Sequence, residues 1–173
     1  MDIHQFLQLF VGRWRSQRSN HQSGQGNGGD ARAEIIITEL SPDASEVVNL
    51  CQKYNFEPQV AISSMQLVWE EDVLSSRKPK GSTVLVAIPT ANNCSGLILS
   101  STSKSSYEFA ADESLTITTA IADGAIEERI WYGNPNLRFR VATLIKSNVS
   151  GDRLVQSSKF YSEIRISTPQ PQR

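Results

Sequence analysis

The sequence predicts an all-β protein in which about ten antiparallel strands close into an up-and-down barrel, with one helix at the N-terminus and a second helix after the second strand. Short runs with alternating apolar and polar residues follow one another, and turn residues separate nearly all of them. Asp123-Gly124 and Ser150-Gly151-Asp152 are strong hairpin signals. Closure of about ten strands removes exposed edges and leaves an interior wider than that of an eight-stranded barrel.

The composition fits one domain over residues 1–173. The chain has 173 residues, of which 39% are hydrophobic, and a formal net charge of -1. A near-neutral charge gives no electrostatic footprint for nucleic acid. No stretch reaches the roughly 20 apolar residues of a membrane span, and the N-terminus lacks a basic segment followed by an apolar run. We therefore expect a cytoplasmic protein with no nucleic-acid partner and no membrane span.

The two cysteines, Cys51 and Cys94, lie far apart and in no C-x-x-C motif. We expect both to be reduced and structural. No cluster of His, Cys and Asp has the spacing of a metal site, and no cofactor-binding loop is recognisable. The sequence therefore predicts no metal and gives no support to hydrolytic or redox chemistry.

The N-terminal part of the chain combines a helix, two strands and a polar loop. Ile3, Phe6, Leu7 and Phe10 recur at helical spacing, which predicts a short amphipathic helix that plugs the core. A strand begins at Val11. The glycine-rich residues 20–31 are predicted to form a flexible loop, which is unlike a phosphate-binding loop because no Lys-Ser/Thr follows.

The second strand is expected at Arg32–Leu40. Ser41-Pro42-Asp43 then predicts a helix N-terminus, with the helix running to about Tyr54. Residues 55–63 are ambiguous and allow another helical turn before Pro58. The remaining strands are expected at Met65–Glu71, Ser82–Ile88, Leu97–Ser101, Tyr107–Ala111, Ser114–Ala122, Ala125–Tyr132, Leu137–Lys146 and Leu154–Ile166, followed by a disordered tail at 167–173.

Acidic and guanidinium side chains alternate along the two strands that meet at a Gly-Asn-Pro-Asn turn. Alternate residues share a face, so Glu128, Arg138 and Arg140 are candidates for the interior. An unpaired buried charge is costly, so these groups need a ligand or one another. The alternative is a surface ladder of Arg138 and Arg140 with Glu127 and Arg129. Acids and guanidiniums together suit a ligand with carboxylates and N–H donors, as linear tetrapyrroles have.

Several motifs together resemble a known family. Gly12-Arg13-Trp14 with Arg165 resembles the lipocalin signature. The wider set resembles the S-type phycobiliprotein chromophore lyases, the CpcS/CpeS/CpcU group of cyanobacteria and related algae, over almost the whole chain. The residues that carry this likeness are Phe6, Trp14, Ser16–Ser19, His21, Gly81–Val86, Glu127–Arg140 and Ser162–Arg165, of which Trp131–Arg140 is the most specific run.

The resemblance implies a lipocalin-like or fatty-acid-binding-protein-like barrel in the cyanobacterial cytosol. It implies that phycocyanobilin or a related bilin such as phycoerythrobilin binds as a substrate, with no cofactor bound permanently. The bilin would then be attached by a thioether to a cysteine of an apo-phycobiliprotein α or β subunit. Because the acceptor thiol belongs to that partner, Cys51 and Cys94 are not expected to be nucleophiles. A homodimer, or a heterodimer with a paralogous lyase subunit, is also implied.

The resemblance also implies roles for single residues. Arg138 and Arg140 match the family's Arg-x-Arg and are expected to bind propionates or to fix the ring conformation. Glu128 is expected to hold the pyrrole nitrogens, although the sequence leaves open whether Glu127 or Glu128 faces inward. Trp69 either stacks on a pyrrole ring or packs in the core.

Further binding candidates are less specific. One of Trp131 and Tyr132 should line the interior, and Trp131 is taken as a bilin contact. The other candidates for binding the bilin are Arg18, His21 and Glu163. Glu163 could instead pair with Arg165, which is expected to close the barrel together with Trp14.

Three departures from the family pattern together suggest a divergent paralogue, such as a U-type subunit. Trp69-Glu70-Glu71-Asp72 replaces a longer hairpin, Ala142 replaces a small hydroxyl residue, and the first loop is glycine-rich where the family is often more apolar. A non-catalytic partner subunit or bilin carrier that acts with an S-type lyase is therefore the alternative function. A generic carrier of a fatty acid is a third possibility and rests on the fold alone.

Overall fold

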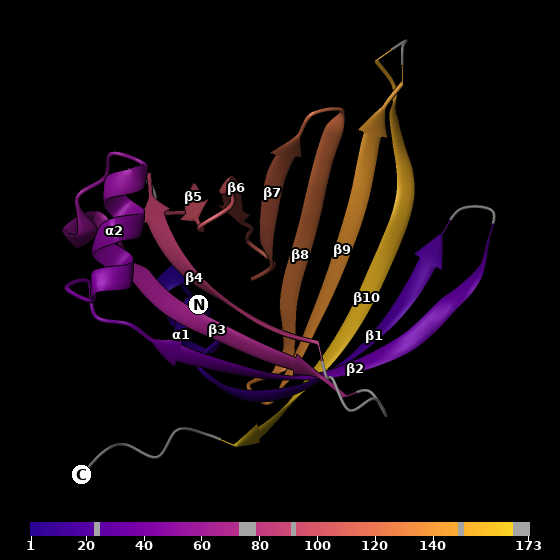
Figure 1. Ribbon diagram of the computed structural model, residues 1–173, viewed down its shortest axis with the longest axis horizontal. Coiled ribbons are helices and arrows are strands. Elements are labelled where there is room, and N and C mark those ends of the chain that lie inside the picture. The colour runs from indigo at the N-terminus through magenta and orange to yellow at the C-terminus, as the bar shows by residue number, and fades with distance from the viewer. Residues whose placement is uncertain (23–24, 73–78, 91–92, 149–150, 168–173) are drawn as a thin grey trace.

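Ten antiparallel strands form one closed barrel in the computed structural model. The structure describes residues 1–22, 25–72, 79–90, 93–148 and 151–167, with only the backbone for 21–22, 25–30 and 167. Each strand pairs with its neighbours in the chain, and β1 pairs with β10, which confirms the predicted up-and-down barrel (Figure 1). The strands are β1 Gly12–Gln22, β2 Gln25–Glu39, β3 Ser63–Glu71, β4 Lys80–Pro89, β5 Ser95–Leu99, β6 Lys104–Phe109, β7 Leu115–Ile121, β8 Gly124–Asn134, β9 Leu137–Ser147 and β10 Arg153–Ser167.

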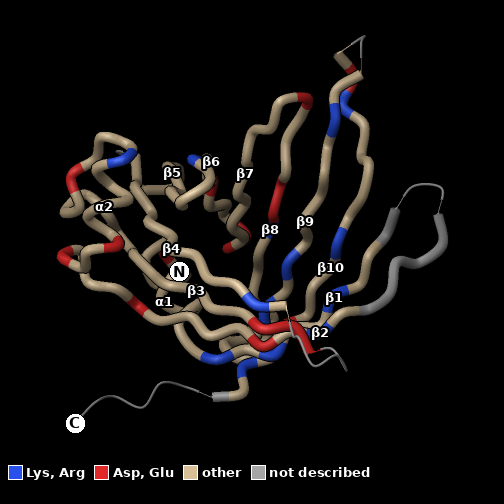
Figure 2. Tube along the Cα trace, viewed as in Figure 1, with Lys and Arg blue, Asp and Glu red and all other residues tan. Residues whose placement is uncertain are grey.

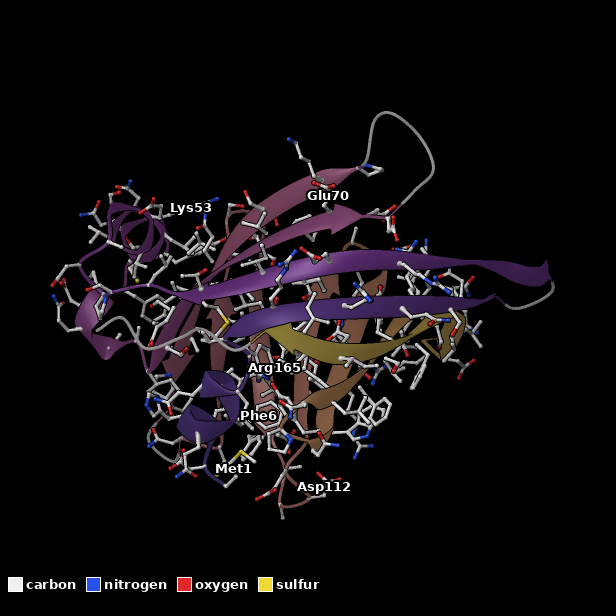
Figure 3. The ribbon with its side chains drawn as sticks, turned by 90° about the horizontal axis from the view of Figure 1, so that it is seen from below. Met1, Phe6, Lys53, Glu70, Asp112 and Arg165 are labelled. Atoms are coloured by element: carbon white, nitrogen blue, oxygen red, sulfur yellow. The ribbon has the colours of Figure 1, made fainter. Side chains whose placement is uncertain are left out.

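The antiparallel order gives the barrel two different ends. The β1–β2, β3–β4, β5–β6, β7–β8 and β9–β10 connections all lie at one end. The N-terminal helix α1, Ile3–Gln8, lies at the other end, where Asp2 caps it through a capping box with Gln5. Phe6 of α1 is fully buried, and its ring centroid lies 5.1 Å from those of Phe109 and Tyr132. The predicted plug is confirmed, and we call this the closed end (Figure 3).

Trp14 and Arg165 lock the plug to the wall, as expected from the sequence. The Arg165 guanidinium lies 4.2 Å from the centroid of the Trp14 ring and donates to the carbonyls of Leu9 and Val11 at 2.7 and 2.5 Å. Trp14 Nε1 donates to the carbonyl of Phe10 at 2.8 Å. The last strand therefore holds the segment that follows α1, and Arg165 forms no pair with Glu163, which corrects that expectation.

A second helix covers the outer face of the sheet. Helix α2, Ser45–Lys53, buries an apolar face against β4 and β5. It begins later than predicted, because Ser41-Pro42-Asp43 forms a turn in which the Ala44 N–H donates to the carbonyl of Ser41. The ambiguous segment contains a 3₁₀ turn at Pro58–Val60, which begins at the proline because that position needs no N–H donor. No helix in the described ranges is long and apolar enough to cross a membrane.

The predicted loop at residues 20–31 is mostly strand. β1 runs to Gln22 and β2 begins at Gln25, with Asn20 opposite Gly28 and Gln22 opposite Gln25. Backbone hydrogen bonds between strands need no particular side chain, so two register shifts accommodate the glycines without ending the pairing. Residues 23–24 and 168–173, which include most of the predicted tail, lie outside the described residues.

Candidate functional site

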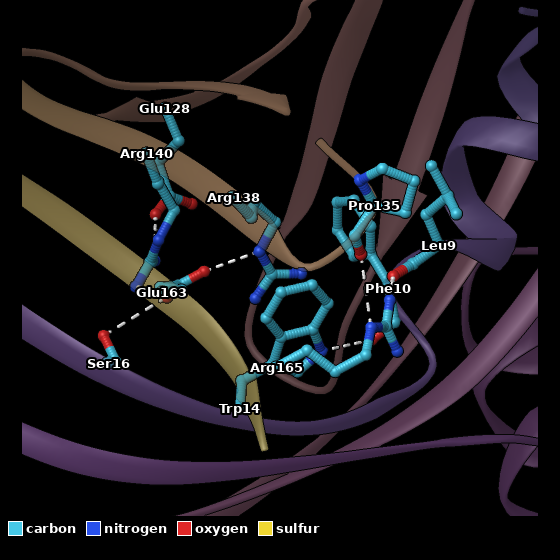
Figure 4. Close-up of polar contacts among 10 residues, drawn as sticks. All are labelled: Leu9, Phe10, Trp14, Ser16, Glu128, Pro135, Arg138, Arg140, Glu163 and Arg165. Atoms are coloured by element: carbon cyan, nitrogen blue, oxygen red, sulfur yellow. Dashed lines mark hydrogen bonds and ion pairs between the residues drawn. The ribbon is translucent and has the colours of Figure 1, made fainter. Parts of the chain in front are cut away.

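The register of β8 and β9 decides which charges face inward. Residues opposite each other in an antiparallel pair share a face, and Tyr132, which packs against the core, lies opposite Arg138. Arg140 lies opposite Ile130, and Glu128 is two residues further along the same face of β8. Glu128, Arg138 and Arg140 therefore all point into the barrel (Figure 4), while Glu127 points outward.

A buried carboxylate lies at the centre of this group. Glu163 on β10 has a side chain that is 0% exposed, and its carboxylate accepts from Arg138 Nε at 2.5 Å and from Ser16 Oγ at 3.3 Å. Arg140 Nη2 lies 3.5 Å from the same carboxylate. Burial alone would raise the pKa of Glu163, but the two guanidiniums outweigh it and hold the pKa below its ordinary value. Glu163 is therefore ionised.

Arg138 belongs to the closed end. Its side chain is only 6% exposed, and its guanidinium lies 4.7 and 4.6 Å from the ring centroids of Phe10 and Trp14. Phe10 belongs to the segment that follows α1, and Trp14 belongs to β1, so Arg138 is enclosed on the side away from the hairpins. Arg138 thus holds Glu163 in place, and the direct ligand contact expected for both arginines stays a prediction for Arg138.

Arg140 and Glu128 form a second, more open pair. Arg140 Nη1 donates to Glu128 Oε1 at 2.8 Å, and the two side chains are 24% and 30% exposed. The Arg140 guanidinium also lies 3.8 Å from the centroid of the Tyr161 ring. Burial alone would lower the pKa of Arg140, but Glu163 and Glu128 outweigh it and raise the pKa. Arg140 is thus cationic and is shared by two carboxylates.

Closer to the hairpin end, β1 and β3 complete the inner wall. Arg18 Nη1 lies 3.9 Å from Glu71 Oε1, which is a loose pair. Trp69 faces inward opposite Gly81 and is 37% exposed. A Cβ atom at Gly81 would lie 2.3 Å from the Trp69 indole, so only glycine lets the indole lie across β4. Trp69 is therefore an inner-wall residue open to solvent, as a stacking role requires, and not a buried core residue.

Exposure increases steadily along the inner face. Trp14 and Glu163 near the closed end are fully buried, whereas Arg140, Glu128 and Trp69 are between a quarter and somewhat over a third exposed. Solvent therefore enters from the hairpin end, which we call the mouth, and reaches the Arg140–Glu128 pair. Figure 2 shows charged residues gathered on β8–β10 and on the neighbouring parts of β1–β3, while β5 carries none.

Two other sequence expectations are changed. Trp131 lies on the outer face, with its ring centroid 5.6 Å from that of Phe139, so it does not line the interior, and Tyr132 does. Glu127 pairs outside with Arg153, and Arg129 with Asp112. The proposed surface ladder is therefore wrong, because Arg138 and Arg140 face the opposite way.

Some predictions lie outside what the structure describes, and two residues were missed. The backbone of His21 pairs with Ser158 near the mouth, but its side chain is not among the described ones. Ser16, which donates to Glu163, and Tyr161, which lies under Arg140, were not predicted. Tyr161 is two residues before Glu163, so strand alternation would have placed it on the same face.

Comparisons with known proteins show the family of the chain. A family model described as CpeS-like protein matches residues 2–166. The chain is 34% identical over 175 residues to chromophore lyase CpcS/CpeS 3 of Trichodesmium erythraeum, covering 95% of this chain and 99% of that one. It is 31% identical over 180 residues to chromophore lyase CpcS/CpeS of Thermosynechococcus vestitus, covering 99% and 96%.

A solved structure is similar over nearly the whole fold. It is the S-type phycobiliprotein lyase CPES from Guillardia theta, with a TM-score of 0.82 and 32% sequence identity, covering 97% of this chain and 94% of that one. That structure and the sequence relatives are all named as lyases.

Proposed function

Because the chain belongs to the CpeS-like family and is a bilin lyase, we propose that it binds phycocyanobilin or a related bilin in the mouth of the barrel and promotes thioether attachment to a cysteine of an apo-phycobiliprotein subunit. The observation that carries this proposal is the partly exposed Arg140–Glu128 pair above the buried carboxylate of Glu163. No other inner-wall pair among the described residues has this arrangement.

Arg140 and Glu128 can exchange each other for groups of a bilin, and no charge is then left unpaired. Its propionate can take the place of Glu128 on Arg140, while Glu128 accepts hydrogen bonds from the pyrrole N–H groups. Arg140 keeps Glu163 at 3.5 Å and the Tyr161 ring throughout, so its position does not depend on the ligand. A fatty acid could take Arg140 but would leave Glu128 without a donor, and the pair therefore favours a bilin over that alternative.

Other inner-wall residues fit the rest of the ligand. Arg18 is held only at 3.9 Å by Glu71, so it is available to the second propionate. The exposed face of Trp69, made possible by Gly81, suits stacking on a pyrrole ring. In this proposal Arg138 takes no direct part, because it is enclosed by Phe10 and Trp14.

The transfer step needs no further reagent. The acceptor thiol sulfur adds to the exocyclic double bond on ring A of the bilin, an S–C bond forms, and the thiol proton passes to the other carbon of that double bond. The contribution of this chain is to hold the bilin in one conformation and to stabilise its protonated pyrrole system through Glu128. Neither Cys51, which lies on the buried face of α2, nor Cys94 lies on the inner wall near Arg140.

The test mixes the purified chain with phycocyanobilin, or with phycoerythrobilin, in the presence and absence of apo-phycocyanin subunits. We expect a red-shifted absorption band on binding. Addition of the acceptor should then give chromophore fluorescence that survives on a denaturing gel. No spectral change with either bilin, with or without an acceptor, would refute the proposal.

A second candidate function is a bilin-binding subunit that transfers only together with a paralogue. The observation that favours it is Ala142, which lies opposite Glu128 on the inner wall, while the hydroxyl of Thr143 points outward. Neither Ala142 nor Thr143 therefore places a hydroxyl beside Glu128. This candidate predicts a heterodimer in size-exclusion chromatography and transfer only when the paralogue is added, and robust transfer by the chain alone would exclude it.

A further inference from the structure

A lysine lies on the inner wall beside the candidate site, on the side toward the mouth. Lys159 on β10 is two residues before Tyr161, whose ring lies under Arg140, so both side chains point into the barrel. Strand β10 starts at the hairpin end, which places Lys159 roughly 7 Å nearer to the mouth than Tyr161. Its neighbours in register are Asn20 on β1 and Ala142 on β9. Lys159 is therefore an inward-facing cation at the mouth.

The arginines around Lys159 each have an acidic partner, whereas Lys159 has none. The arginine pairs are Arg138–Glu163, Arg140–Glu128 and Arg18–Glu71. Lys159 is exposed, and no acid within the described part of the chain pairs with it. This part of the wall therefore carries one positive charge that is not compensated, which favours an anionic ligand.

Two buried polar atoms on the neighbouring strand lack hydrogen-bond partners within the described ranges. Arg18 Nε is a donor without an acceptor, and Asn20 Oδ1 is an acceptor without a donor. In the β1–β10 register Asn20 lies opposite Lys159, and Arg18 lies opposite Tyr161. A buried polar atom without a partner is unfavourable. A ligand that offers both a carboxylate oxygen and an N–H group would satisfy both atoms.

The wall between Lys159 and Glu128 carries only a methyl group. Ala142 lies opposite Glu128 on one side and opposite Lys159 on the other. The cation and the acid are thus two strand spacings apart, roughly 10 Å at the backbone. Glu128 pairs with Arg140 and leaves Lys159 free. A bilin can therefore lie across Ala142, with an anionic group at Lys159 and N–H groups at Glu128.

We propose that Lys159, together with Arg18, forms a second carboxylate subsite for the bilin. This inference rests on the proposed function and adds a residue to it. One propionate binds Arg140, and the other binds between Lys159 and Arg18. Lys159 is a diagonal neighbour of Arg18 and of Arg140, with Cα atoms roughly 7–8 Å apart, which long side chains can span. The site therefore selects a ligand with two carboxylates.

The test changes the charge at one inward and one outward position. Lys159→Gln removes the cation, and Lys159→Arg keeps it. The matched control is Lys104→Gln, because Lys104 starts β6 at the hairpin end and points outward, next to the buried Ser105. The affinity for phycocyanobilin is measured by absorption titration at about 50 mM and about 300 mM NaCl, because salt screens exposed charges.

We expect the Kd of Lys159→Gln for phycocyanobilin to rise about three- to tenfold at the lower salt concentration, from the loss of an ionic contact at a partly open site. The difference from the wild type should shrink at the higher salt concentration. Lys159→Arg should stay within about twofold of the wild type, because the charge is retained. Lys104→Gln should bind as the wild type does.

Three outcomes would overturn the subsite. They are an unchanged Kd in Lys159→Gln, an equal rise in Lys104→Gln, which would assign the effect to the overall charge of the protein, and an equal rise in Lys159→Arg, which would show that the charge is not what matters. A wild-type protein that fails to bind phycocyanobilin is a different result, because it refutes the proposed function and the subsite with it.

Discussion

The two Arg–Glu pairs of the inner wall contain the same chemical groups but differ in how far they are exposed to solvent. At the closed end, Arg138 and Glu163 are 6% and 0% exposed and are surrounded by aromatic rings. Toward the mouth, Arg140 and Glu128 are 24% and 30% exposed. A fully enclosed pair can only be broken at high cost, whereas a half-open pair can exchange partners with a ligand. Depth in the barrel, more than chemistry, therefore separates the structural pair from the functional one.

The largest expected effect is on the closed-end pair. Arg138→Met roughly keeps the volume of the side chain but leaves the buried Glu163 with Arg140 at 3.5 Å and the Ser16 hydroxyl at 3.3 Å. Removing one partner of a buried ion pair costs about 3–5 kcal/mol, and we expect the free energy of unfolding in urea to fall by the lower part of that range. Combining Arg138→Met with Glu163→Met should recover most of the loss, because no buried charge is then left unmatched. A single variant within about 1 kcal/mol of the wild type would show that the pair is not structural.

The next largest effect concerns the Arg140–Glu128 pair, and we expect it in the affinity for phycocyanobilin. Glu128→Gln removes the charged acceptor for pyrrole N–H groups, and hydrogen bonds to a charged group are worth about 1.5–3 kcal/mol, so phycocyanobilin affinity should fall roughly ten- to hundredfold. The free energy of unfolding should change by less than about 1 kcal/mol. The matched control is Glu127→Gln, the adjacent outward residue, which should leave bilin affinity unchanged. Equal losses in both variants would remove Glu128 from the site.

The two tryptophans extend the comparison to the two faces of the wall. Trp69 faces inward and is partly exposed, whereas Trp131 packs against Phe139 on the outer face. Trp69→Leu should weaken bilin binding about fivefold, from the loss of an aromatic contact worth about 1 kcal/mol. Trp131→Leu should have no effect on the absorption spectrum of the bound bilin. The opposite pattern would mean that the bilin binds to the outer face.

The sequence predicted the strands, and which side chains face inward, better than it predicted how deeply each side chain is buried. Hairpin turns such as Asp123-Gly124 fix where strands end, and alternation groups Glu128, Arg138 and Arg140 because a strand has a period of two. Depth depends on contacts between distant parts of the chain. Arg138 is enclosed only because the plug brings Phe10 onto it, and no local pattern around residue 138 reports that contact.

The same limit explains the errors. Alternate residues of β8 face the core, and the local sequence does not say which alternate set does so. Tyr132 belongs to the inward set, because it packs against Phe6. The helix start was misplaced because Ser41-Pro42 suits both a helix N-terminus and a turn, and local preference does not separate them. Residues whose role follows from alternation were predictable, and residues whose role follows from the plug were not.

The smallest effect is a dependence of stability on pH, confined to acid conditions. Arg138 and Arg140 outweigh burial and hold the pKa of Glu163 below its ordinary value in the folded protein. An unfolded glutamate titrates at about 4.3, so below that pH the unfolded chain binds more protons than the native one. The stability contributed by ionised Glu163 is therefore complete above about pH 5 and is lost as the pH falls through the folded pKa.

This contribution can be isolated by urea unfolding at several pH values between about 3 and 7. The wild type is compared with the variant that combines Arg138→Met with Glu163→Met, because the other carboxyl groups are common to both proteins. The difference in unfolding free energy should be constant from about pH 7 to pH 5 and should then shift against the wild type as the pH is lowered. A difference that stays constant to about pH 3 would mean that Glu163 is protonated, or equally ionised, in both states. The pKa of Glu163 would then be the same in the folded and unfolded chains, and the closed-end pair would contribute no stability that depends on pH.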